Sequence, residues 1–331
     1  MNKQQTAIGL DIGTSRLVAA TQKGSECVFQ AQLNAFLTLP YSKLTHSALK
    51  KDNVPHEIKG DEVVIFGNES ERFANLFLRE TRRPMTRGLL NPQETAAISA
   101  ISHLVGTLIG TESGNGRRLC VSIPGASAES QTDLTYHEAT VRRMLSDLGF
   151  QVSTINEGLA VILAELEDTN FTGIGISWGG GMCNVCLAYL AMPVFSFSVP
   201  KAGDYIDASA ASVAAEGATQ VRAVKEQSFH FNGFFADKIH QAISVYYEDV
   251  IVSVVKALKD YLAKTRNVPR LDRPIPIVVS GGSALPDGFR ERFEKLLEPA
   301  GLPIKISEVR IAPDPLHSTA KGALVSALAE I

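Results

Sequence analysis

Apolar residues alternate with small or polar residues on both sides of a glycine near the start of the chain. The apolar positions are Ile8, Leu10, Ile12, Leu17 and Val18. This period-two pattern predicts a strand, a tight turn and a second strand. Gly13 permits the turn because glycine lacks the Cβ that would clash there. Thr14 and Ser15 bring hydroxyl and backbone N–H groups to the tip of the turn. Such a tip can cradle phosphate oxygens, although an ordinary hairpin fits the same pattern.

The same pattern of an apolar run followed by a glycine turn recurs twice. The glycines of the later turns are Gly179, Gly180, Gly181, Gly281 and Gly282. About half of the 331-residue chain separates Asp11 from Ser177, which ends the second apolar run. A motif repeated at that spacing predicts two like domains that face each other. Three such turns around one cleft would form a nucleotide site, and Asp11 beside the first turn is suited to hold a hydrated Mg²⁺.

Strands alternate with helical patterns along the rest of the chain, which predicts the α/β class. Five segments matter below: a strand over residues 26–39, an irregular segment over 40–60, a helix over 91–109, a long helix over 236–265 and a strand near 304–306. In addition, Asn156 is placed to begin a helix that carries Glu157 in its first turn.

Charge and composition narrow the classes of function. The net charge of −3 gives no electrostatic argument for binding nucleic acid, so no partner of that kind is expected. The N-terminus is polar and no apolar stretch reaches the roughly 18 residues of a membrane span, so direct membrane insertion is not expected. We therefore predict a cytoplasmic protein, in which Cys183 and Cys186 are buried free thiols rather than a zinc or redox pair.

Seven segments, in order, resemble motifs of the superfamily of actin, DnaK-type chaperones and sugar kinases, and most of all the MreB family of bacterial actins. They are residues 8–15, 83–88, 156–160, 179–181, 202–204, 281–285 and 314–323. In that family these segments are the first phosphate loop, an R-P-M-x-x-G motif, the first connecting helix, the second phosphate loop, a G-G-D motif, the adenosine motif and the second connecting helix. The resemblance covers nearly the whole chain.

The resemblance implies an actin-like ATPase fold of two ribonuclease-H-like domains around a nucleotide cleft. The first domain would span residues 1–155, with a small subdomain inserted at about 31–82. The second would span residues 156–331, with a reduced small subdomain at about 216–235. Its C-terminal helix would pack back on the first domain.

The resemblance also implies a site for ATP or ADP with Mg²⁺. Asp11 would lie near the metal, and Glu157 would orient or activate the attacking water. The residues that would contact phosphates and adenosine are Gly13, Thr14, Ser15, Gly179, Gly180, Gly181, Gly203, Asp204, Gly281, Gly282, Ser283 and Ala284. Arg222 would approach the ribose.

Two departures from the family pattern change the expected function. Ser177 stands where the family has a carboxylate, and Met182 stands where it has a hydroxyl, so hydrolysis should be slow. The small subdomain at 216–235 is shorter than in MreB, and its phenylalanines either fill its core or form a contact between protomers. We expect a protein that assembles with itself into filaments, and other cytoplasmic proteins are further candidate partners.

Three alternatives compete with a filament protein. The first is a non-polymerising, chaperone-like or regulatory ATP-binding protein of the same superfamily, and the second is a sugar or acetate kinase. The third is a serine hydrolase, because residues 175–179 read G-x-S-x-G around Ser177. That motif needs a helix directly after the serine, whereas the sequence here predicts a glycine turn and a strand. The single tryptophan, Trp178, would plug the interdomain core or pack near the nucleotide.

Overall fold

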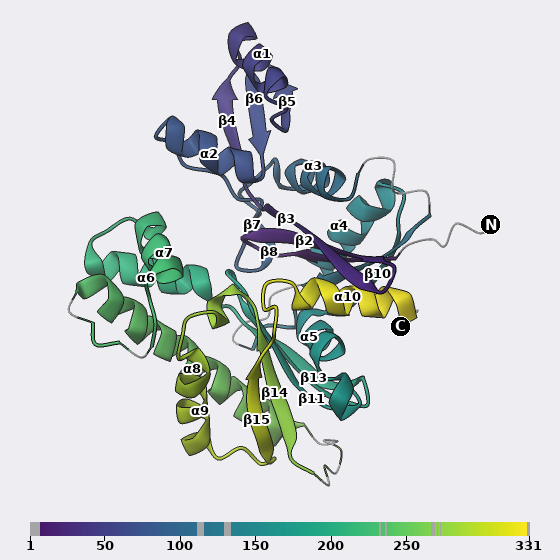
Figure 1. Ribbon diagram of the computed structural model, residues 1–331, viewed down its shortest axis with the longest axis vertical. Helices are drawn as coiled ribbons and strands as arrows, with labels where there is room; N and C mark the ends of the chain where they lie inside the picture. The colour runs from purple at the N-terminus through teal and green to yellow at the C-terminus, as the bar shows by residue number, and fades with distance from the viewer. Residues whose placement is uncertain are drawn as a thin grey trace.

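Two five-stranded sheets form the centre of the molecule, with helices packed against them (Figure 1). The computed structural model describes residues 7–110, 116–128, 134–231, 233–235, 237–265, 269, 271 and 273–329. A small unit projects beyond the first sheet and a helical arm beyond the second. The polar N-terminus, on which the membrane expectation partly rested, lies outside the described residues. Within those residues, no helix has the length and apolar character that a membrane crossing requires.

The first sheet has the strand order β10-β9-β1-β2-β3. Its strands are β1 (Ile8–Ile12), β2 (Arg16–Lys23), β3 (Glu26–Leu33), β9 (Arg118–Ile123) and β10 (Gln151–Asn156). The first three form an antiparallel meander, whereas β9 and β10 run parallel to β1. Apolar side chains of β1 and β9 pack against two helices that cover one face, α3 (Ala97–Ile109) and α4 (Leu134–Asp147).

The second sheet repeats this plan in the order β13-β12-β11-β14-β15. Its strands are β11 (Gly173–Trp178), β12 (Cys183–Tyr189), β13 (Met192–Val199), β14 (Ile275–Ser280) and β15 (Ile306–Ile311). The hairpin registers also match, since Asp11 pairs with Val18 in the first sheet and Ser177 pairs with Asn184 in the second. The two halves therefore share one topology, and Ser177 occupies in the second sheet the position that Asp11 occupies in the first.

Two helices lie between the sheets and link them. The first, α5 (Glu157–Glu165), follows the last strand of the first sheet but packs on the second sheet. The other, α10 (Ser318–Ala329), follows the last strand of the second sheet but packs on the first. Glycines permit this close approach, because a Cβ on Gly9 would overlap the backbone of α10 and one on Gly322 would overlap that of Ala160 in α5.

The small unit corrects two of our predictions. Its elements are β4 (Phe36–Pro40), α1 (Lys43–Lys51), β5 (His56–Lys59), β6 (Glu62–Phe66) and α2 (Asn68–Leu76). The strand predicted over 26–39 is two strands, β3 and β4, which belong to different sheets. The segment 40–60 is not irregular, because Ser42 caps α1 by accepting a hydrogen bond from the Thr45 amide at 3.0 Å. This helix buries only Leu49, so its apolar pattern is too weak to reveal it.

Three further boundaries differ from the sequence prediction. The helix expected from Asn91 begins at Ala97, because residues from Asn91 onward first form turns, with the Glu94 amide donating to the Asn91 carbonyl at 3.1 Å. The strand expected near 304–306 is β15, which begins at Ile306. The two-residue strands β7 (Met85–Thr86) and β8 (Leu89–Leu90) form a hairpin that includes part of the motif at residues 83–88.

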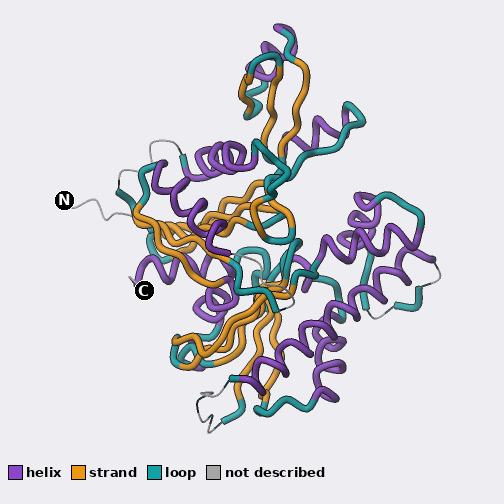
Figure 2. Tube along the Cα trace, turned by 180° about the vertical axis from the view of Figure 1, so that it is seen from behind, coloured by secondary structure: helices purple, strands orange, loops and turns teal. Residues whose placement is uncertain are grey.

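The helical arm consists of three helices, as Figure 2 shows from behind. They are α6 (Gly203–Ala214), α7 (Ala218–Gln227) and α8 (Lys238–Lys264). Three phenylalanines of the segment after α7, Phe229, Phe231 and Phe235, pack into or against the core of the second half. Phe234 alone of the four is exposed. The hypothesis that all four form a contact between protomers is therefore wrong, because three of them stabilise the fold of the arm.

Candidate functional site

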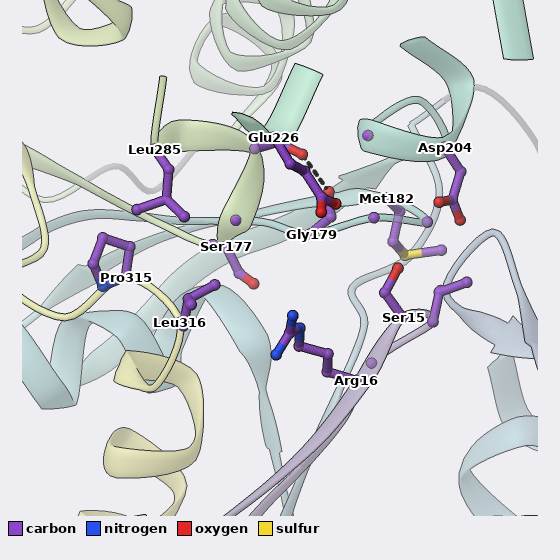
Figure 3. A pocket seen from close by; sticks show the side chains of 18 of the residues that line it. Ser15, Arg16, Ser177, Gly179, Met182, Asp204, Glu226, Leu285, Pro315 and Leu316 are labelled. Carbon is purple, nitrogen blue, oxygen red and sulfur yellow. Dashed lines mark hydrogen bonds between the residues drawn. The ribbon is translucent and has the colours of Figure 1, made fainter. Parts of the chain in front are cut away.

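A cavity of about 460 Å³ lies where the glycine turns of the two halves meet (Figure 3). The turn after β1, the turn after β11 and the turn after β14 all line it. The predicted site residues among its walls are Asp11, Gly13, Thr14, Ser15, Glu157, Gly179, Gly180, Gly181, Gly203, Asp204, Arg222, Gly281, Gly282 and Ser283. Ala284 is the exception: it is buried in the core of the second half and does not line the cavity. The contact of Ala284 with the nucleotide therefore stays a prediction.

The first turn is held rigid from both sides. The Gly13 amide donates to the Arg16 carbonyl at 2.9 Å, and the Asn34 side chain donates to the Gly13 carbonyl at 2.8 Å. The hydroxyl of Thr14, which is buried, accepts a hydrogen bond from the Gly88 amide at 2.9 Å. The hairpin that contains Gly88, formed by β7 and β8, therefore supports the first turn.

The second turn crosses the cleft to meet the first. A Cβ on Gly181 would overlap the Thr14 hydroxyl, and one on Gly180 would press on that of Ser15. The Asp204 amide, in the first turn of α6, donates to the Gly180 carbonyl at 2.8 Å. Only glycine allows the two turns to approach this closely, which explains the residue type at both positions.

The third turn adopts a conformation that favours glycine. Gly281 has φ +102, and its amide donates to the Pro315 carbonyl at 2.8 Å. A Cβ at Gly281 would also overlap the carbonyl of Trp178. Trp178 itself does not plug the interdomain core or line the cavity. Its ring packs edge-on against Phe289 and Phe293 inside the second half.

Two half-buried carboxyl groups, those of Asp11 and Glu157, face the cavity. Asp11 accepts a hydrogen bond from the Ser122 hydroxyl at 2.6 Å, and Glu157 accepts one from the Ser177 hydroxyl at 2.9 Å. Burial, together with repulsion from Asp11, raises the pKa of Glu157 to about 8. Burial raises the pKa of Asp11 to about 6, and the hydrogen bond from Ser122 offsets part of the effect of burial. The pair thus holds a proton near neutral pH, which a bound cation would displace.

The carboxyl pair fits a hydrated magnesium ion. The described residues contain no group of three or more histidine, cysteine, aspartate or glutamate side chains that could enclose a metal. Magnesium in nucleotide sites commonly keeps several waters and takes one or two carboxylates plus phosphate oxygens. Asp11 with Glu157 provides a donor set of that kind, and the adjoining turns provide space for phosphates.

Arg222 lies at the cavity wall, but its guanidinium is engaged elsewhere. Its Nη2 pairs with Glu71 of α2 at 3.1 Å, which joins the helical arm to the small unit across the cleft. Lys225, one turn further along α7, pairs with Asp207 at 2.7 Å. Lys225, Asp207 and Glu226 also line the cavity, and sequence reasoning missed them. The spacing of Lys225 and Glu226 after Arg222, on one face of α7, was the available signal for those two residues, whereas Asp207 lies on the neighbouring helix α6.

Ser177 is not the nucleophile of a serine hydrolase. It ends β11 and is followed by the glycine turn and β12, whereas a nucleophile elbow requires a helix at that point. Its hydroxyl donates to Glu157 instead of to a histidine. The G-x-S-x-G match is therefore accidental.

The duplicated halves, the two connecting helices and the glycine turns around one cleft define the actin-like ATPase fold. Solved structures of this fold resemble the chain over nearly its full length. The MamK double helical filament has a TM-score of 0.69 at 19% identity, over 98% of this chain and 99% of that one. MreB5 of Spiroplasma citri bound to AMPPNP has a TM-score of 0.64 at 15% identity, over 98% and 96%.

A third structure, the ethanolamine utilization protein EutJ from Carboxydothermus hydrogenoformans, has a TM-score of 0.57 at 17% identity, over 97% of this chain and 89% of that one. No curated protein matches the sequence significantly. The family profile described as Volactin matches residues 6–327. The chain belongs to the Volactin family.

Proposed function

We propose that this protein binds ATP and ADP with Mg²⁺ in the cleft and assembles with itself into filaments. The observation that carries the proposal is the convergence of three glycine turns and a carboxyl pair on one cavity between the two halves. Backbone N–H groups of such turns can bind phosphate oxygens, and the turn at Gly281 and Gly282 would face the nucleoside. Structures of similar fold are described as bound to AMPPNP or ADP, which supports a nucleotide here.

Slow hydrolysis is the chemistry that these side chains support. The Ser177 hydroxyl donates a hydrogen bond to the Glu157 carboxyl and so orients it. Once Glu157 has released its proton, its carboxylate would accept a proton from the attacking water. A magnesium ion would supply charge stabilisation for phosphoryl transfer and would keep the Glu157 carboxyl ionised. Neither Ser177 nor Met182 contributes a charge or a second carboxylate to that task. Turnover should therefore be slower than in actin-like ATPases that carry the acid.

Self-assembly is the second part of the proposal. MamK, whose fold is similar, is described as a double helical filament, and a head-to-tail contact that does not close on itself extends into a filament. Two ion pairs cross the cleft, Arg222 with Glu71 and Arg83 with Asp204, so nucleotide in the cleft would favour a closed arrangement of the halves. The free cysteines fit a cytoplasmic location.

Calorimetry and sedimentation test the two parts separately. Titration of ATP with Mg²⁺ should give saturable binding at one site per chain. Sedimentation should then show a pelleted fraction that grows with protein concentration when ATP is present. Saturable binding without any pelleted protein at high concentration would support the non-polymerising, regulatory alternative. Absence of binding would reject the nucleotide site itself.

A further inference from the structure

Three cationic side chains line the cavity, and two of them are already paired. Within the described residues these cations are Arg16, Arg222 and Lys225. Arg222 pairs with Glu71, and Lys225 pairs with Asp207 while also donating to the Gly203 carbonyl at 3.0 Å. Their charges are thus largely neutralised by the protein itself.

Arg16 differs from these two. It is the first residue of β2, directly after Thr14 and Ser15 of the first turn, and its side chain is exposed. Its side chain lines the cavity and extends toward Leu316, with Ser15 on the other side of it (Figure 3). Across the part of the chain that the structure describes, no hydrogen bond or ion pair engages this guanidinium. The hydrogen bond from the Gly13 amide to the Arg16 carbonyl fixes the backbone from which it projects.

We propose that Arg16 is a phosphate ligand of the nucleotide, and this inference rests on the proposed function. A nucleoside triphosphate brings several negative charges into a site whose other nearby ionisable groups, Asp11 and Glu157, are acidic. A planar guanidinium can donate two parallel hydrogen bonds to phosphate oxygens. Arg16 is the cation in the described lining that is free to do so.

Calorimetry with ATP, ADP and AMP in the presence of Mg²⁺ tests the inference on the full chain. Arg16→Ala should weaken ATP binding about 10- to 100-fold, since hydrogen bonds between charged groups are the strong ones. The loss should grow with the number of phosphates, and Arg16→Lys should recover part of the affinity. Lys23→Ala, at the exposed far end of the same strand, is the matched control and should bind ATP as the native protein does.

Two results would overturn the role of Arg16. One is unchanged ATP affinity in Arg16→Ala. The other is an equal loss for AMP and ATP, because that would indicate a structural effect on the turn. A native protein that binds none of the three nucleotides would instead overturn the proposed function. The unfolding temperature of Arg16→Ala without nucleotide should stay close to that of the native protein, since the side chain is exposed and, among the described residues, makes no hydrogen bond or ion pair that the change would remove.

Discussion

Asp11 and Glu157 make the stability of this protein depend on pH. A carboxyl whose pKa is raised in the folded state binds its proton more tightly there than in the unfolded chain. The stabilisation that Glu157 contributes is therefore fully present below pH 4.5, which is its ordinary pKa, and is lost as the pH rises through about 8, its pKa in the folded protein. For Asp11 the loss occurs between 3.8 and about 6.

We expect the protein without nucleotide or Mg²⁺ to lose thermal stability between pH 6 and 8, and Glu157→Gln to remove most of that loss. Unfolding temperatures measured across this range check the prediction. Glu80→Gln, at an exposed position, serves as the control and should keep the native slope. Equal slopes for native protein and Glu157→Gln would contradict the assignment.

Ser177 limits the chemistry of the same pair. Ser177→Asp would place a carboxyl next to Glu157, in place of the hydroxyl that now donates a hydrogen bond to it. With Mg²⁺ and ATP, phosphate release should rise about 10-fold or more, because a charge placed at a reacting centre contributes on that scale. Without a cation the third carboxyl should lower the unfolding temperature above pH 8. Ser177→Asn keeps the shape without the charge, so an equal acceleration by Asn would refute an electrostatic origin.

At the scale of elements, two neighbouring glycines in the turn after β14 allow an effect on folding to be distinguished from an effect on nucleotide binding. A Cβ at Gly282 meets only the flexible Leu316 side chain, at 3.4 Å, whereas one at Gly281 would overlap the Trp178 carbonyl. Gly282→Val should therefore fold and lose ATP affinity at least about 10-fold, since its side chain enters the cavity. Gly281→Val should fold poorly, as circular dichroism would show. A folded Gly282→Val with native ATP affinity would place the nucleotide elsewhere.

The elements also show how far the sequence could predict this molecule. Glycine turns after apolar strands are local signals, so the repeated sheets and most of the cavity lining were predictable. The helix after Ser42 was missed because it buries a single residue, Leu49. The partner of Arg222 could not be read from sequence, because Glu71 lies 151 positions away and meets it only when the cleft forms. The burial of Ala284 outside the cavity lining could not be predicted either, because a motif match does not say which side of a turn faces the cavity.

At the scale of the whole molecule, the two halves meet across the cleft through ion pairs. Glu71→Arg would replace the pair between Glu71 and Arg222 by a repulsion. Because exposed pairs contribute only about 0.2–1 kcal/mol, the unfolding free energy should change little. Closure of the cleft should become harder, so sedimentation should show a higher protein concentration for assembly with ATP. The double variant Glu71→Arg with Arg222→Glu restores opposite charges and should restore assembly.

Arg72→Ala is the matched control for that exchange, because Arg72 pairs with Glu69 within α2 and does not cross the cleft. Its assembly threshold should equal that of the native protein. An unchanged threshold in Glu71→Arg would show that this contact has no part in assembly. Failure of the double variant to recover would point to a local distortion of α2 rather than to cleft closure.

Negative-stain electron microscopy of the native protein and of Gly282→Val, each with ATP, with ADP and without nucleotide, tests the central claim most directly. The claim is that nucleotide bound in this cleft drives self-assembly. It predicts filaments of the native protein with ATP, few or none without nucleotide, and none for Gly282→Val under any condition. Isolated particles of the native protein at high concentration with ATP would contradict it, as would filaments that form equally well without nucleotide.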